Sequence, residues 1–126
     1  MIGSTRNVRV WAAPQPTDLR KGYDGLYGLV SGALGRDPQS GDLFLFVNRS
    51  RRSCKVLYWD GTGLCIFCKR LEKGQFAKLW RDDGALQLTT SELALFLEGC
   101  ELVGRRALSP PVAKILPIAL ALTHRA

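Results

Sequence analysis

The cysteine and histidine residues of this 126-residue chain that could bind zinc are four cysteines and one histidine. Only Cys65 and Cys68 have the C-x-x-C spacing of a zinc ligand pair, and Cys54, Cys100 and His124 lie outside it. The sequence offers no second pair, and in a strand these two sulfurs would point to opposite faces. We therefore expect reduced cysteines that pack as small apolar residues, with no metal and no cofactor.

Acidic side chains could instead support a metal-dependent nuclease, whose carboxylates must converge within a few ångströms. The candidates Asp18, Asp24 and Asp60 are single acids in turns. A hairpin turn explains Asp60 and a helix cap explains Asp18. The glycines near residues 22–32 follow neither the G-x-G-x-x-G nor the Walker spacing of a phosphate-binding loop. We therefore expect a protein that is not an enzyme.

Positive charge is concentrated in one region of the chain. Between Arg49 and Arg81 there are nine cations and two anions, a net charge of +7, whereas the remainder carries nine of each. Such an asymmetry is typical of a surface that meets phosphate or an acidic partner. The residues that we expect to contact nucleic acid are these cations and an aromatic neighbour: Arg49, Arg51, Arg52, Lys55, Lys69, Arg70, Lys73, Lys78 and Trp59.

A β-hairpin within residues 54–74 is the element that must position these cations. Two apolar runs flank Asp60-Gly61-Thr62-Gly63, and Asp-Gly between such runs is a strong hairpin signal because glycine reaches positive φ without a clash. A continuous apolar run precedes them, across the basic loop 49–53. Together the runs predict an antiparallel meander of three strands, Leu43–Val47, Lys55–Trp59 and Leu64–Arg70, with the cations at its ends.

A fourth strand, Asn7–Ala13, is predicted from alternating residues and is expected to join one edge of the sheet. A helix over Lys21–Leu34 follows from its apolar stripe, with Thr17 and Asp18 as candidate N-caps. Its four glycines would let it lie close against a sheet or a second copy of the chain, so a homo-oligomer stays open. A second helix is predicted after the capping box of Thr89 and Glu92.

The fold class predicted from these elements is α+β: one domain over residues 1–104, with a small antiparallel meander of about four strands packed against two helices. One helix should cover one face of the sheet, and the other face should be partly open. Residues 71–85 are expected to be irregular, and residues 105–126 to form an irregular tail. The apolar run 115–122 is broken by Pro117 and is shorter than the ~20 residues that span a bilayer. We expect a cytoplasmic protein without a membrane partner.

Several short motifs, in a fixed order over about residues 8–104, resemble a known family. The family is the small accessory protein, called TnpB or second open reading frame product, of the insertion sequence sixty-six transposons; it is distinct from the RNA-guided nuclease of the same name. The motifs are Val10-Trp11, Thr17-Asp18-Leu19-Arg20-Lys21-Gly22-x-Asp24-Gly25-Leu26, Asp37-Pro38, Gly41, Leu43-Phe44-x-Phe46, Lys55-x-Leu57-x-Trp59-Asp60-Gly61-x-Gly63-Leu64, Lys69-Arg70-Leu71-Glu72-x-Gly74-x-Phe76 and Leu97-Glu98-Gly99.

The resemblance implies an accessory protein that is needed for transposition beside a larger transposase and has no established catalytic residues. The expected partners are transposon DNA, the transposase and a sibling accessory protein. Read with the charge pattern, it predicts a non-catalytic factor that contacts DNA phosphates, with weak sequence specificity and a steep salt dependence. The alternative is an adaptor that docks an acidic patch of the transposase without touching nucleic acid. RNA binding stays open, because no RNP-type aromatic motif argues for or against it.

Overall fold

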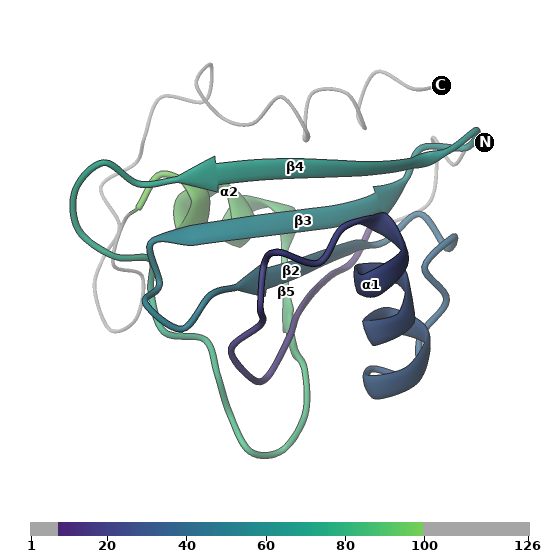
Figure 1. Ribbon diagram of the computed structural model, residues 1–126, viewed down its shortest axis with the longest axis horizontal. Helices are drawn as coiled ribbons and strands as arrows, with labels where there is room; N and C mark the ends of the chain where they lie inside the picture. The colour runs from purple at the N-terminus through teal and green to yellow at the C-terminus, as the bar shows by residue number, and fades with distance from the viewer. Residues whose placement is uncertain (1–7, 100–126) are drawn as a thin grey trace.

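The structure is a computed structural model that describes residues 8–99; the expected tail, Cys100 and His124 lie outside the described residues. Five strands form one sheet in the order β4-β3-β2-β1-β5, which confirms the α+β class (Figure 1). The elements in chain order are β1 (Val10–Ala12), α1 (Tyr23–Gly28), η1 (Leu29–Ala33), β2 (Leu43–Val47), β3 (Ser53–Trp59), β4 (Leu64–Arg70), β5 (Leu86–Leu88) and α2 (Thr90–Leu97).

The meander of β2, β3 and β4 is antiparallel, as predicted, and its strands agree with the predicted ones within two residues. Its hairpin turn comprises Asp60 to Gly63. Gly61 has a φ of 105°, a backbone conformation that is unfavourable for any residue with a Cβ atom. Asp60 N–H donates to Gly63 O at 3.1 Å and so closes the turn. The local signal of an Asp-Gly pair between apolar runs was therefore sufficient to place the hairpin.

β1 joins one edge of the meander, as predicted, next to β2, but it is not the outermost strand, because β5 pairs with its other side. Val10 pairs in parallel with Leu43 of β2 and antiparallel with Leu88 of β5. The parallel pairing follows from the chain path, since α1 and η1 form the crossover that parallel neighbours require. The strand β5 was not predicted, because its three residues are too few for a reliable alternation.

One face of the sheet is covered by α1 and η1, which lie in front of it in Figure 1. Leu26 and Val30 are buried there against Phe44, Phe46 and Leu57. The helix begins later than expected, with Gly22 at the N-cap position and no side-chain cap. Asp18 does not cap it; its carboxylate accepts from Arg20 N–H at 3.0 Å within its own turn. Tertiary burial therefore holds a helix whose glycines and missing cap give it little intrinsic stability.

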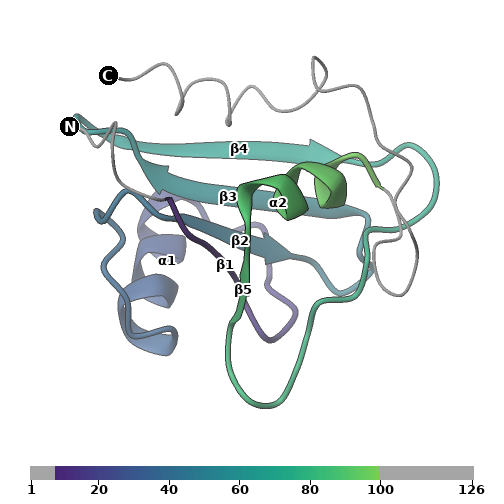
Figure 2. The same ribbon diagram turned by 180° about the vertical axis from the view of Figure 1, so that it is seen from behind.

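The opposite face is covered in part, by α2 and the segment 76–80, whereas Phe67 of β4 on this face is only half-buried among residues 8–99, in line with the expected partly open face. Phe76 and Phe96 stack with ring centroids 4.8 Å apart and are fully buried. Figure 2 shows α2 in front of the sheet on this side. The predicted capping box is confirmed, because Glu92 N–H donates to Thr89 Oγ1 and Thr89 N–H donates to the Glu92 carboxylate. In residues 8–99 no helix is long and apolar enough to cross a membrane.

Candidate functional site

Two loops meet at the end of the sheet where β2 and β4 finish and β3 begins, at the left of Figure 1. Leu71 N–H donates to Arg52 O at 2.8 Å, and Phe76 N–H donates to Arg51 O at 2.6 Å. These bonds join the β2–β3 loop to the segment after β4. Five of the predicted contact residues are brought together in this way, and we call them the basic end: Arg49, Arg51, Arg52, Arg70 and Lys73.

Asn48 shapes the β2–β3 loop. Its Oδ1 accepts from the backbone N–H groups of Arg52 and Ser53, both at 3.1 Å, and its carbonyl accepts from Arg51 N–H at 2.9 Å. Arg51 is the one described non-glycine residue with a positive φ, 59°. This left-handed conformation costs on the order of 1 kcal/mol for a residue with a Cβ, so other contacts of Arg51 must compensate.

The side chains of Arg51 and Arg52 are engaged in holding the two loops together. Arg51 Nη1 donates to Phe76 O at 3.0 Å, and its Nη2 donates to Gln75 Oε1 at 3.3 Å. Arg52 Nη2 donates to Glu72 O at 3.3 Å. A guanidinium has five N–H donors, so both residues keep donors and full charge for a ligand. Their first role in the structure is nevertheless to join the loops.

Lys55 and Lys69 lie on opposite faces of the sheet and fix other elements. Lys55 Nζ donates to Lys21 O at 3.1 Å, next to the start of α1. The half-buried Lys69 donates through Nζ to Leu97 O at 2.7 Å, at the carboxyl end of α2. An ammonium there satisfies an unpaired helix carbonyl and opposes the negative end of the helix dipole. The structure therefore places these two predicted contact residues on different faces, and each donates a hydrogen bond to a backbone carbonyl of the same chain.

Four predicted cations are exposed and carry no side-chain hydrogen bond or ion pair with any residue in 8–99: Arg49, Arg70, Lys73 and Lys78. The first three belong to the basic end. Lys78 lies between buried Ala77 and Leu79 in the segment that covers the α2 face. Free, solvated ammonium and guanidinium groups are the ones that can form new bonds to phosphate without breaking internal ones.

Trp59 is not part of the basic end. It is half-buried and pairs with Leu64 at the hairpin end of β3, six residues from Ser53, or roughly 20 Å at the rise of a strand. Beside it, the Asp60 carboxylate accepts from Thr62 N–H and Gly63 N–H, each at 2.9 Å. These bonds lower the pKa of Asp60 to about 2. The ionised Asp60 stabilises the turn in which it lies.

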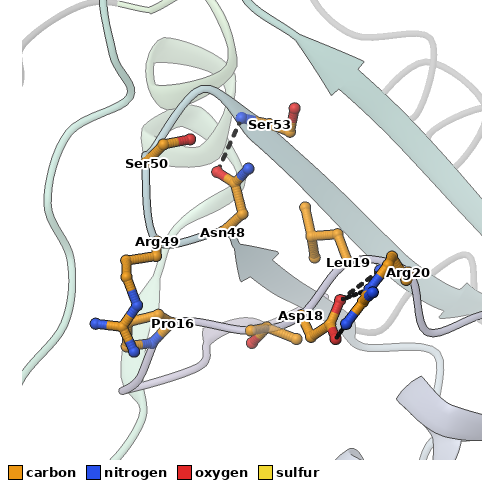
Figure 3. Close-up of a pocket in the computed structure, with 9 residues that line it drawn as sticks. Pro16, Asp18, Leu19, Arg20, Asn48, Arg49, Ser50 and Ser53 are labelled. Atoms are coloured by element: carbon orange, nitrogen blue, oxygen red, sulfur yellow. Dashed lines mark hydrogen bonds and ion pairs between the residues drawn. The ribbon is translucent and has the colours of Figure 1, made fainter.

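An open pocket of about 690 Å³ adjoins the basic end, between the segment 16–20 and the β2–β3 loop (Figure 3). The Asp18 carboxylate lies at its rim, paired with the guanidinium of Arg20 at 2.7 Å, and this pairing lowers the pKa of Asp18. The pocket could not be predicted from the sequence because its two walls are about thirty residues apart. Its lining residues are Pro16, Thr17, Asp18, Leu19, Arg20, Asn48, Arg49, Ser50 and Ser53.

The cysteines are separated in the structure. Cys65 pairs with Tyr58 and Cys68 with Lys55, three residues apart on one strand, which places the two sulfurs on opposite faces. Cys54 is buried, and burial raises the pKa of its thiol to about 12. Within residues 8–99 no three side chains among His, Cys, Asp and Glu come together as a metal site would require.

Comparison with known proteins gives matches over most of the chain. Residues 8–107 match the family model described as IS66 Orf2 like protein. The uncharacterized protein y4jC of Sinorhizobium fredii strain NBRC 101917 / NGR234 is 40% identical over 101 residues, which are 80% of this chain and 86% of the relative. The uncharacterized protein y4hO of the same strain is 39% identical over 101 residues, 80% of this chain and 88% of the relative. No solved structure matches.

Proposed function

The chain belongs to the family of IS66 Orf2-like proteins, a membership that implies an accessory role associated with transposition, and we propose that it fulfils this role by contacting DNA phosphates through its basic end. The observation that carries the proposal is the grouping of Arg49, Arg70 and Lys73. Arg49 comes from the β2–β3 loop, Arg70 from the last position of β4 and Lys73 from the segment after it; all three lie at one end of the sheet and bond to no other side chain in residues 8–99.

The chemistry of these groups predicts the kind of binding. Lysine and arginine neutralise phosphates and release condensed counterions, so affinity falls as salt rises. Phosphate contacts position a protein on DNA but carry no sequence information directly. The basic end consists of loop residues and the last residue of β4, so it offers no helix or strand that could enter a groove and read base edges. We therefore expect binding with weak sequence preference and a steep dependence on salt.

A triple variant tests the proposal: Arg49→Gln with Arg70→Gln and Lys73→Gln. None of these side chains bonds within the described fold, so the variant should fold normally. We expect weaker binding to duplex DNA, measured by fluorescence anisotropy over a salt series. The slope of log affinity against log salt should become shallower by about 0.9 for each phosphate that the variant no longer neutralises.

The matched control removes the same charge elsewhere, by Arg9→Gln with Arg36→Gln and Arg81→Gln. These three arginines are exposed and lie outside the basic end, but Arg36 lies over the ring of Trp11 and Arg81 pairs with Asp83, so urea denaturation must first show that the control variant is folded under the assay conditions. The control variant should keep most of its affinity for duplex DNA and lose only what the lower net charge of the whole protein removes. Equal losses in both triple variants would show that only net charge matters and would remove the basic end as the contact surface.

The proposed role is non-catalytic. The Asp60 carboxylate accepts hydrogen bonds within its turn and the Asp18 carboxylate pairs with Arg20, and within residues 8–99 no group of three His, Cys, Asp or Glu side chains comes together to share a metal ion. Incubation of plasmid DNA with the protein and Mg²⁺ or Mn²⁺ should give no cleavage. Cleavage that disappears in Asp60→Asn would instead identify a nuclease.

The pocket beside the basic end favours a second candidate, an adaptor that docks an acidic segment of the transposase. Arg20 and Arg49 flank a cavity that also has apolar walls at Pro16 and Leu19, a lining that suits a peptide side chain as well as a nucleotide. Co-purification with the transposase from nuclease-treated extract, together with no DNA binding by the isolated protein, would favour this candidate over the first.

A further inference from the structure

β4 forms one edge of the sheet and has the properties of an open pairing surface. It is seven residues long, contains no proline and keeps a continuous register with β3 from Leu64 to Arg70, without a bulge. The opposite edge, β5, has only three residues. Proteins usually protect long edges with proline, bulges, inward charges or a cover. Among residues 8–99, no segment pairs with the outer side of β4.

The backbone groups that face outward can be deduced from the hydrogen bonds at the two ends of the hairpin. Leu71 N–H donates to Arg52 O and Asp60 N–H donates to Gly63 O, so these two pairs are hydrogen-bonded. In an antiparallel ladder such pairs alternate with pairs whose backbone groups point away from each other. The outward N–H and C=O groups of β4 are therefore those of Leu64, Ile66, Cys68 and Arg70.

We propose that this edge pairs antiparallel with β4 of a second copy, about a two-fold axis at Phe67. This register places Leu64 opposite Arg70 of the second copy and Ile66 opposite its Cys68. Every outward group of both strands is then used, which gives about eight backbone hydrogen bonds, two for each pair. The two sheets would join into one of ten strands.

The charge distribution along β4 favours β4 of a second copy as the partner strand. Its only charged residues, Lys69 and Arg70, lie at its carboxyl end. Antiparallel pairing places them opposite Cys65 and Leu64, which are uncharged, whereas parallel pairing would put like charges side by side. Like charges directly opposite one another destabilise a sheet. A second copy of β4 is thus complementary to the first in charge as well as in hydrogen bonding.

The side chains near the axis support the same register. Phe67 would face Phe67 of the second copy across a non-hydrogen-bonded pair, the closer of the two pair types, where an aromatic pair contributes roughly 0.2–1 kcal/mol. Ile66 and Phe67 are only half-buried in the single chain and pack on opposite faces of the sheet. Pairing would extend both apolar cores across the new junction.

The test uses the full-length protein, free of nucleic acid and in reductant, over a broad concentration series. We expect light scattering to give twice the mass of one 13.9 kDa chain at high concentration. Cys68→Pro should give a single chain, because its N–H faces outward and is not part of the β3–β4 ladder. Cys68→Ser keeps the N–H, removes the thiol and should dimerise as the native protein does.

Amide hydrogen exchange keeps the test decisive if Cys68→Pro folds poorly. The amides of Leu64, Ile66, Cys68 and Arg70 should become protected in the native protein as concentration rises. Three results would overturn the proposal: a single chain at every concentration, a dimer that Cys68→Pro retains, or protection of these four amides that does not depend on concentration. The last would mean that another part of the same chain covers the edge. The outcome is independent of whether the basic end binds DNA.

Discussion

Arg51 shows that a cation in a basic loop can be used by the fold before any ligand arrives. Its guanidinium bonds to Phe76 O and Gln75 Oε1, and its backbone carbonyl accepts from Phe76 N–H. Phe76 is fully buried and stacks on Phe96. Arg51 therefore connects a surface loop with the core on the α2 face, and the left-handed backbone of Arg51 is maintained by these contacts.

We expect Arg51→Ala to lower the free energy of unfolding by about 1–3 kcal/mol, because two hydrogen bonds from a charged donor are removed while the left-handed backbone remains. Urea denaturation followed by circular dichroism measures the change. Arg49→Ala is the matched control in the same loop, and since its side chain makes no bond within residues 8–99 it should stay within about 0.5 kcal/mol of the native value. Equal stability of the two variants would mean that the guanidinium bonds contribute nothing.

At the scale of elements, α2 is fixed at both ends by side chains from different parts of the sequence. Its amino end has the capping box of Thr89 and Glu92, and its carboxyl end has Lys69 of β4 bonded to Leu97 O. Gly99 follows with a φ of 81°, the left-handed conformation that ends many helices. The contact of Lys69 ties α2 to the strand that we propose as a pairing edge.

We expect Lys69→Met to lower the free energy of unfolding by about 1–2 kcal/mol, because Leu97 O loses its donor and the end of α2 loses a compensating charge. The amides in the last turn of α2 should also exchange faster, as native-state hydrogen exchange can measure. Lys73→Met is the control, since Lys73 is exposed and unbonded within residues 8–99. An unchanged exchange rate in α2 would contradict the role of Lys69.

The elements that could be predicted from the sequence are those with local signals. The Asp60-Gly61 turn and the capping box of Thr89 each require only neighbouring residues, and both were placed correctly. The interior position of β1 depends on β5, more than seventy residues further along the chain, and no local pattern specifies that pairing. The clustering of charge identified the region of the candidate site, but which cations the fold already uses depends on carbonyls such as Phe76 O and Leu97 O.

At the scale of the whole molecule, one sheet separates two apolar cores. Leu26 is buried in the core under α1, and Leu93 in the core under α2. Both cores rest on alternating residues of the same strands, such as Phe44 and Leu45 of β2. Neither core can lose its packing without exposing the sheet that supports the other.

We therefore expect Leu26→Ala and Leu93→Ala each to lower the stability of the entire described domain, by about 2–5 kcal/mol. Unfolding should stay a single transition, with coincident curves from tryptophan fluorescence, which reports Trp11 in the α1 core together with Trp80 beside the α2 core and Trp59 in β3, and from far-ultraviolet circular dichroism. Exposed Ser31→Ala serves as the control, with a change within about 0.5 kcal/mol. Two separate transitions in either leucine variant would show that the cores unfold independently.

The interior position of β1 also bears on how the protein is made. β1 is among the first described residues to leave the ribosome, yet its neighbour β5 follows 76 residues later, from Val10 to Leu86. At roughly 5–20 residues per second, β1 waits about 4–15 s for that neighbour. During this interval the nascent chain can form the β2–β3–β4 meander, while one side of β1 stays available to other chains. Translation pauses or truncations before residue 86 would prolong the exposure of β1. Once β5 pairs with β1, the sheet is complete and β1 can no longer pair with other chains on that side.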